Sequence, residues 1–256
     1  MVSRFCYDKI LCHTDDSGHE LCQDGCPLQK SMESGQKCKA DVYLKHKLGN
    51  RVSVSVRVAP IKGSEGKVVG AVEVFLDNSN KKKLERRTDE LNRIAYYDSL
   101  TGLVNRRYLE MRLQQAHQEF LTFGRPFAMI LFDIDHFKQV NDSCGHPAGD
   151  IVLAHVAQLL ANNLRVTDSI GRWGGEEFLA LLPKTSIERA EMLADRCRGI
   201  VSSTSLSVDA KRVSPSVSAG VAEFRTGDDV TSMMKRVDAA LYRSKSDGRN
   251  RVSTVY

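Results

Sequence analysis

The first regular element is marked by strict alternation of polar and apolar residues. Residues 51–58 read Arg-Val-Ser-Val-Ser-Val-Arg-Val, and this period of two predicts a half-buried strand. The glycine-bearing stretch 62–66 predicts a turn, and the apolar run 68–76 predicts a second strand. Two such runs joined by a short glycine turn are typical of an antiparallel hairpin. Residues 1–40 are polar and lack periodicity, so we expect a small N-terminal segment over residues 1–76.

A different pattern begins at residue 77. Leu84, Leu91 and Ile94 recur at heptad-like spacing among charged and polar residues, and no Gly or Pro interrupts them up to residue 97. A single narrow apolar stripe is typical of the seam of a parallel two-stranded coiled coil. Residues 77–97 are therefore predicted to form a linker helix. The cations at 81–83 and 86–87 are interpreted as its solvated face rather than as a binding patch.

From residue 98 onward, helical and strand patterns alternate. The continuous apolar run at 127–132 is typical of a strand buried on both faces. Helices are predicted at 108–120, 150–164, 186–201 and 230–246, and further strands at 169–173, 177–182 and 213–224. Mixed elements of this kind predict an α/β domain over residues 98–256.

The amino-acid composition indicates the general class of protein. The chain has 256 residues, 41% hydrophobic and 27% charged, which is ordinary for a globular protein of two domains. Its net charge of +5 suits an enzyme acting on nucleotide polyphosphates as well as it suits nucleic acid, and the basic residues form no long tract. No run approaches the roughly 20 apolar residues needed for a transmembrane segment, and no secretory signal is present. We therefore expect a cytoplasmic protein that does not bind nucleic acid.

The first group of residues with chemical potential follows the buried strand. Residues 132–138 read Phe-Asp-Ile-Asp-His-Phe-Lys, so the apolar run leads directly into Asp133. The strand ends of an α/β sheet are where ligands bind. A carboxylate there suits Mg²⁺, which prefers oxygen ligands and substrate phosphates. The alternative is that the two Asp residues cap the next turn.

The second group is Gly174-Gly175-Glu176-Glu177-Phe178. Two glycines between strands permit a tight hairpin and close approach of a polyphosphate to the backbone. Consecutive residues on a strand point to opposite faces, so one glutamate can complete a metal site with Asp133 while the other faces substrate. The alternative is an ordinary hairpin with solvated glutamates.

These residues resemble the GGDEF-domain diguanylate cyclases, in the Gly-Gly-Glu-Glu-Phe form. The resemblance extends over five blocks in the family's order, at 98–107, 132–138, 141–150, 172–178 and 240–250. It implies a nucleotidyl-cyclase-like fold, with a central mixed sheet flanked by helices. It also implies an enzyme that condenses two GTP molecules into cyclic di-GMP.

The resemblance also implies a catalytic centre. Asp133 and Glu176 would ligate Mg²⁺ (or Mn²⁺ in its place) by their carboxylates and Ile134 by its carbonyl, with two ions per active site. Glu177 would help to deprotonate the attacking 3′-hydroxyl. Gly174 and Gly175 would shape the hairpin.

Substrate recognition is implied in the same way. Asn141 and Asp150 would bind guanine, and a buried match of this kind discriminates against ATP. Lys138, Lys245 and Arg249 resemble the family's phosphate contacts, and His146 lies in the substrate loop. Lys245 and Arg249 are four residues apart and are expected on one face of the last helix. Their alternative role is that of ordinary cations at a helix C-terminus.

The resemblance further implies a homodimer and product inhibition. Each domain holds one GTP, so two domains must face each other, and the helix at 77–97 offers a means of setting that alignment. Arg165 and Asp168 match the family's inhibitory site for cyclic di-GMP, with Arg196 as a secondary contact. The alternative is a surface ion pair between residues i and i+3.

The N-terminal segment is less defined. Residues 40–76 resemble the closing strands of a PAS sensor domain, whose opening strands are missing, shortened or outside this chain. Five of the seven cysteines lie in the first 40 residues. Four of them suggest a metal or iron–sulfur site: Cys6, Cys12, Cys22 and Cys26. The alternative is that they are ordinary loop or buried cysteines.

Two other functions remain as alternatives. One is a catalytically silent GGDEF domain that acts as a receptor for cyclic di-GMP or GTP, which the intact carboxylates and glycines disfavour. The other is a metal-binding module confined to the N-terminal region.

Overall fold

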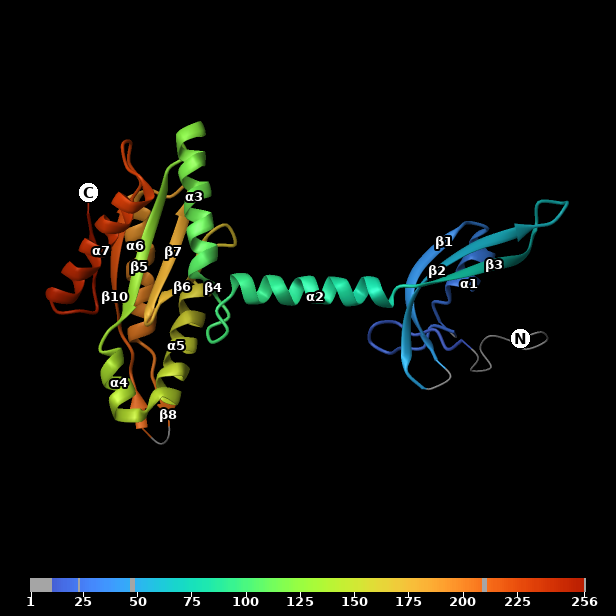
Figure 1. The fold of residues 1–256 in the computed structure, drawn as a ribbon, viewed down its shortest axis with the longest axis horizontal. Coiled ribbons are helices and arrows are strands. Elements are labelled where there is room, and N and C mark those ends of the chain that lie inside the picture. The colour runs from blue at the N-terminus through green and yellow to red at the C-terminus, as the bar shows by residue number, and fades with distance from the viewer. Residues whose placement is uncertain (1–10, 23, 47–48, 209–210, 256) are drawn as a thin grey trace. The chain divides into compact units, whose positions relative to one another are not determined.

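The computed structural model describes residues 11–22, 24–46, 49–208 and 211–255. The chain divides into two compact units, Met1–Glu90 and Leu91–Tyr256. Each unit is described by itself below (Figure 1).

The N-terminal unit contains an antiparallel sheet in the order β1-β2-β3. Its strands are β1 (Cys38–Lys45), β2 (Arg51–Lys62) and β3 (Val68–Asp77), so the predicted hairpin is confirmed as β2–β3. Helix α1 (Pro27–Ser34) and β1 lie where the sequence shows little periodicity. The helix begins with Pro27 in its first turn and ends at the left-handed Gly35, the residue types that favour those positions. A small valine core forms on one face of the sheet: Val42, Val54, Val56 and Val58.

The predicted linker helix is present as α2 (Ser79–Tyr96). Leu84, Leu91 and Ile94 are between 59% and 71% exposed in the single chain. An apolar stripe left in solvent is what a coiled-coil seam requires, but the pairing itself stays a prediction.

The C-terminal unit is built on a mixed sheet in the order β11-β10-β5-β7-β6-β4. The inner pairs β10–β5, β5–β7 and β7–β6 are antiparallel, and the outer pairs β10–β11 and β6–β4 are parallel. The strands are β4 (Val104–Asn105), β5 (Phe127–Ile134), β6 (Ser169–Gly174), β7 (Glu177–Pro183), β10 (Val217–Glu223) and β11 (Val252–Thr254). The predicted α/β class with a mixed sheet is confirmed.

Helices cover both faces of this sheet (Figure 1). Every residue of β5 is buried, and its side chains alternate between two cores. Ile130 and Phe132 pack with α5 (His146–Ala161) and α6 (Ile187–Ser202). Met129 and Leu131 pack with α3 (Arg106–Phe123) and α7 (Val230–Ser246). Burial on both faces is why the sequence of this strand is a continuous apolar run.

Two predicted elements begin at clearly different residues. The strand predicted from residue 213 begins only at Val217, because Pro215 cannot donate a ladder hydrogen bond. Val213 belongs instead to a small hairpin of β8 (Leu206–Val208) and β9 (Lys211–Val213). The helix predicted from residue 150 begins at His146, and a separate short helix, α4 (Phe137–Cys144), precedes it. No helix in the described part of the chain is long and apolar enough to cross a membrane.

Candidate functional site

Three acidic residues meet at one end of the central sheet. Asp133, near the end of β5, lies directly opposite Glu177, the first residue of β7, in antiparallel register. The Ile134 amide donates to the main-chain carbonyl of Glu176, at 3.3 Å. The register of β5 and β7 therefore gathers the carboxylates that the sequence places in two separate motifs.

A lysine from α7 completes this cluster. The ammonium Nζ of Lys245 lies 2.7 Å from Oδ2 of Asp133, and their side chains are 33% and 7% exposed. The structure thus brings Lys245 to the carboxylates, which the helix-terminus alternative does not require.

The pKa values of two carboxylates, Asp133 and Glu177, are raised. Burial raises the pKa of Asp133, the Lys245 ammonium opposes that rise, and the charges of Glu176 and Asp135 add to it. Burial also raises the pKa of Glu177, and the negative charge of Asp133 acts in the same direction. A carboxylate with a raised pKa binds a proton more readily, so the cluster is costly when fully ionised.

The donor atoms of the cluster are oxygens, the type that a hard divalent cation prefers. Among the described residues, no three His, Cys, Asp or Glu side chains come together in an arrangement that would hold a metal ion. The ammonium of Lys245 instead supplies the positive charge beside Asp133. Mutually repelling carboxylates at a strand end are nevertheless the oxygen donors that Mg²⁺ binds, and a divalent cation would relieve the repulsion.

The glycine hairpin is held by a residue that the sequence reasoning did not single out. The guanidinium of Arg172 donates through Nε and Nη2 to the carbonyl of Gly175, at 2.9 and 2.7 Å. Its Nη1 lies 3.5 Å from Oδ2 of Asp98, and Asp98 also accepts from the amide and hydroxyl of Thr101, both at 2.8 Å. Arg172 therefore ties the hairpin to the entrance of the domain. In the sequence, only its position two residues before Gly174 could have indicated this role of Arg172.

Asp135 is also tied to the fold. Its carboxylate accepts from the hydroxyls of Ser216 and Ser218, at 2.7 and 2.6 Å, and from the amide of Asn250, at 3.0 Å. This buried carboxylate joins the end of β5 to β10 and to the segment after α7. Of the two aspartates, Asp135 has the structural role, whereas Asp133 faces Glu177 and Lys245.

The predicted guanine-binding residues lie on α4 and α5. Asn141 is packed so closely against Gly149 that a Cβ there would collide with its side-chain oxygen Oδ1. That oxygen is buried and has no hydrogen-bond partner. Asp150 follows Gly149 and is exposed. The contact with Gly149 thus brings Asn141 close to the neighbouring residue Asp150.

The remaining predicted phosphate contacts are more dispersed. Lys138 and His146 are exposed at the beginnings of α4 and α5. The expectation that Arg249 shares a helix face with Lys245 is wrong. Helix α7 ends at Ser246, because Gly248 turns the chain with φ +115°, and Arg249 follows in the left-handed region at φ +62°. Its main-chain amide donates to the carbonyl of Ser244, at 3.0 Å.

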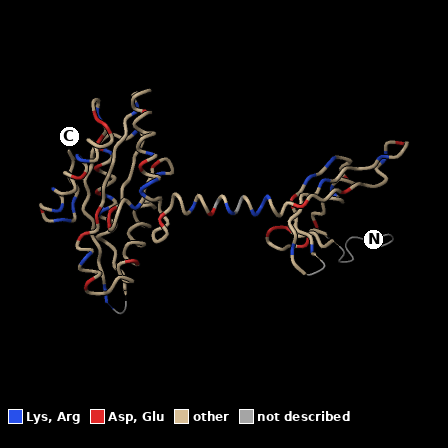
Figure 2. Tube along the Cα trace, viewed as in Figure 1, with Lys and Arg blue, Asp and Glu red and all other residues tan. Residues whose placement is uncertain are grey.

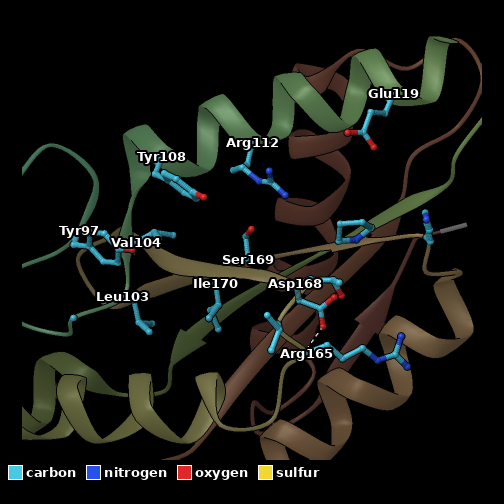
Figure 3. A pocket seen from close by; sticks show the side chains of 15 residues that line it. Tyr97, Leu103, Val104, Tyr108, Arg112, Glu119, Arg165, Asp168, Ser169 and Ile170 are labelled. Carbon is cyan, nitrogen blue, oxygen red and sulfur yellow. Dashed lines mark hydrogen bonds between the residues drawn. The ribbon is translucent and has the colours of Figure 1, made fainter. Parts of the chain in front are cut away.

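Arg165 and Asp168 form a tight turn before β6. The carboxylate of Asp168 accepts from the main-chain amide of Arg165 at 2.9 Å, and the Asp168 amide donates to the Arg165 carbonyl at 3.0 Å. Figure 3 shows the Arg165 side chain extending away from that carboxylate. The contact therefore runs through the main chain of Arg165, unlike the surface ion pair considered as the alternative.

Two hollows meet at this turn. One, of about 670 Å³, is lined by Arg165 and Asp168 together with Tyr108 and Arg112 of α3 (Figure 3). The other, of about 450 Å³, is lined by the same two residues and by Arg196 of α6. Nη2 of Arg196 donates to the carbonyl of Asn163, at 2.7 Å. The three residues predicted for the inhibitory site thus share one hollow.

The N-terminal cysteines do not form a recognisable metal centre within the described residues. Cys26 is buried at the start of α1, and Cys12 and Cys22 are partly buried. Cys6 lies outside the described residues, so the four-cysteine site stays a prediction.

Comparison with known proteins agrees with the geometry of the C-terminal unit. Diguanylate cyclase DgcM of Escherichia coli is 39% identical over 176 residues, which are 69% of this chain and 42% of DgcM. The probable diguanylate cyclase DgcE of Escherichia coli is 32% identical over 238 residues, 91% of this chain but 21% of DgcE. The chain therefore spans less than half the length of either relative.

A solved structure is similar as well. The coiled coil and GGDEF domain of DgcB from Caulobacter crescentus, in complex with c-di-GMP, has a TM-score of 0.66 at 32% identity. The similarity covers 70% of this chain and 95% of that one. The family model described as "Diguanylate cyclase, GGDEF domain" matches residues 95–251. With more than half of its length matched, the chain belongs to the GGDEF-domain family.

Proposed function

We propose that the chain is a diguanylate cyclase, which condenses two GTP molecules into cyclic di-GMP and two pyrophosphates. The observation that carries this proposal is the pairing of Asp133 with Glu177 at the sheet end, beside Glu176 and Lys245. This cluster lies inside the region that matches the family.

The proposed metal ligands are the carboxylates of Asp133 and Glu176 and the carbonyl of Ile134. Mg²⁺ or Mn²⁺, two ions per site, would neutralise charge on the triphosphate and on the leaving pyrophosphate. Lys245 would then exchange its bond to Asp133 for a phosphate oxygen. An ammonium on a flexible stem suits such an exchange.

Glu177 is the proposed proton acceptor. The 3′-oxygen of one GTP bonds to the α-phosphorus of the other, its proton passes to the Glu177 carboxylate, and the bond to pyrophosphate breaks. A second such step closes the ring. The raised pKa of Glu177 supports this role, because a base works best with a pKa near the working pH.

Guanine selection is assigned to Asn141 and Asp150. The Oδ1 of Asn141 has no partner within the protein and would accept from the base once a ligand or a side-chain rotation brings the two together. Asp150 would accept from guanine N–H groups that adenine does not offer in the same place. Lys138, His146 and Arg249 are the proposed supporting contacts to phosphate.

Two further properties belong to the proposal. The enzyme acts as a homodimer, with the exposed stripe of α2 as the means of alignment. Cyclic di-GMP inhibits through Arg165, Asp168 and Arg196, whose shared hollow supports this assignment. The N-terminal unit would act as a PAS-like sensor.

The test is incubation of the purified, nucleotide-stripped chain with GTP and Mg²⁺, followed by mass-resolved chromatography. We expect cyclic di-GMP from the wild type, little from Glu177→Gln, and more sustained production from Arg165→Ala. GTP or cyclic di-GMP binding with no product from either the wild type or Arg165→Ala would favour the receptor alternative and overturn the proposal.

A further inference from the structure

A hollow of about 710 Å³ lies within the N-terminal unit, apart from the catalytic cluster. One wall is the sheet and the other is the beginning of α2. The lining residues are Tyr43, Arg51 and Ser53 from the strands, and Ser79, Lys82, Lys83, Arg87 and Glu90 from the helix.

The two walls are fastened to each other. The Asn78 amide donates to the Ser53 carbonyl at 2.9 Å, just before the helix begins. Lys82 and Arg51 both lie over the ring of Tyr43, at 4.5 and 4.3 Å from its centroid. Nζ of Lys82 also lies 3.1 Å from the Tyr43 hydroxyl and 3.1 Å from Oδ1 of Asp16.

These contacts correct the interpretation of the basic run as a simple solvated face. The Lys82 side chain is only 24% exposed and forms part of a wall. Hydrogen bonding to Tyr43, then to Asp16, raises the pKa of Lys82, so it stays cationic. The hollow is therefore a shaped feature of the unit.

The charge of the lining is unbalanced. Arg51, Lys82, Lys83 and Arg87 face one lining carboxylate, Glu90, and Asp16 offsets Lys82 from outside. The first turn of α2 contains no acidic residue, and Figure 2 shows several basic positions in the N-terminal half of the helix. Cations there oppose the positive end of the helix dipole, which favours anions. An anion in the hollow would relieve both repulsions.

A second observation points to a ligand independently of charge. Ser53 is 6% exposed, and its hydroxyl has no hydrogen-bond partner. An unpaired buried hydroxyl is destabilising, because it has lost its contact with water and gained no partner in exchange. Because Ser53 lines the hollow, a ligand oxygen there is a natural partner for its hydroxyl.

We propose that this hollow binds a small oxyanion carrying two or more negative charges. Guanidinium and ammonium groups recognise phosphate and carboxylate oxygens alike, so the shared chemistry is that of a phosphate ester or a polycarboxylate. The bound anion contacts Lys83 and Arg87 on α2 and Arg51 and Ser53 on the sheet. It therefore fastens the first turns of the linker helix to the sheet.

The test is isothermal titration of the full chain, without GTP or metal and at fixed ionic strength, with inorganic phosphate and separately with citrate. The site variant is Lys83→Gln/Arg87→Gln. The matched control is Lys67→Gln/Arg93→Gln, which removes the same charge from exposed positions outside the hollow. We expect the site variant to weaken binding about tenfold, because it loses two solvent-exposed ion pairs to the anion. The control should weaken binding less than about twofold. Whichever probe binds more tightly identifies the ligand as a phosphate or a carboxylate.

Hydrogen exchange gives a readout that does not depend on cyclase activity. The bound probe should slow exchange of the amides of residues 80–87 in the wild type and in the control, but not in the site variant. Absence of saturable binding for both probes would overturn the proposal. Equal loss of affinity in the site and control variants would do the same, because binding would then reflect net charge alone.

Discussion

Replacing Glu177 with Gln should stabilise the metal-free protein while abolishing the proposed chemistry. Glu177 lies directly across the β5–β7 ladder from Asp133, so two negative charges are neighbours on adjacent strands. Lys245 pairs with Asp133, which leaves Glu177 as the carboxylate with the weaker compensation.

The size of the effect follows from this pairing. Directly opposed like charges in a sheet destabilise by about 0.2–1 kcal/mol, and burial of the Glu177 charge adds to that cost. We expect a gain of about 1 kcal/mol for Glu177→Gln at pH 8. For a unit of this size the gain corresponds to a rise in Tm of about 2–4 °C.

The stability difference between the wild type and Glu177→Gln should depend on pH. The pKa of Glu177 is raised in the folded state, so the wild type loses stability as pH rises from the ordinary glutamate range through the raised value. Glu177→Gln should therefore exceed the wild type fully at pH 8 and match it near pH 4. Trp173, the single tryptophan, stacks on Arg106 at 4.6 Å in this unit, so its fluorescence reports the unfolding directly.

A divalent metal ion should reduce the stability difference between the two proteins. Mg²⁺ is expected to stabilise the wild type more than the Glu177→Gln variant, because the repulsion between Asp133 and Glu177 exists only in the wild type. A Glu177→Gln protein that is less stable than the wild type at pH 8, or equally shifted at pH 4 and pH 8, would refute the electrostatic account of the cluster.

Three further substitutions test the surroundings of the site by urea unfolding monitored at Trp173. Lys245→Gln should lower the free energy of unfolding by about 1–2 kcal/mol without metal, because it leaves the buried Asp133 unpaired. Mg²⁺ should recover part of this loss, and no recovery would argue against a cation site there. Asp135→Asn should cost about 2–3 kcal/mol, since an amide N–H₂ would face hydroxyl and amide donors that now share a carboxylate; an unchanged midpoint would contradict its structural role. Gly220→Ala should cost about 1–3 kcal/mol, because its Cβ would strike the backbone of α7, whereas the control Gly199→Ala meets nothing within 4 Å and should be neutral or stabilising.

Local sequence patterns predicted the helices and strands better than they predicted which side chains of different elements come into contact. The continuous apolar run of β5 placed Asp133 at a strand end, and the paired glycines placed Glu177 at the start of a strand. That the two residues face each other depends on the register of β5 and β7, which is set by packing on both faces of the sheet. The contact of Lys245 with Asp133 likewise depends on how α7 lies against the sheet.

Errors arose where the backbone departs from its periodic pattern. Arg249 is four residues after Lys245, the spacing of one helix face. Gly248, with its positive φ, lies outside the helical conformation, so the helix ends before it reaches Arg249. Lys82 lies in a charge run that normally signals a solvated face, and only the tertiary contact with Tyr43 reveals its partial burial. The short elements α1, α4 and β4 were missed because a helix of eight residues completes only about two turns, and a strand of two residues has no period at all.

Phosphorus NMR of the nucleotide-stripped wild type during incubation with GTP and Mg²⁺ tests directly whether the chain makes cyclic di-GMP. We expect the GTP signals to be replaced by those of pyrophosphate and a cyclic phosphodiester, with two pyrophosphates for each cyclic dinucleotide. Glu177→Gln should slow the appearance of both products together. Release of inorganic phosphate as the primary product, or tight GTP binding with no turnover, would contradict the proposed cyclase activity.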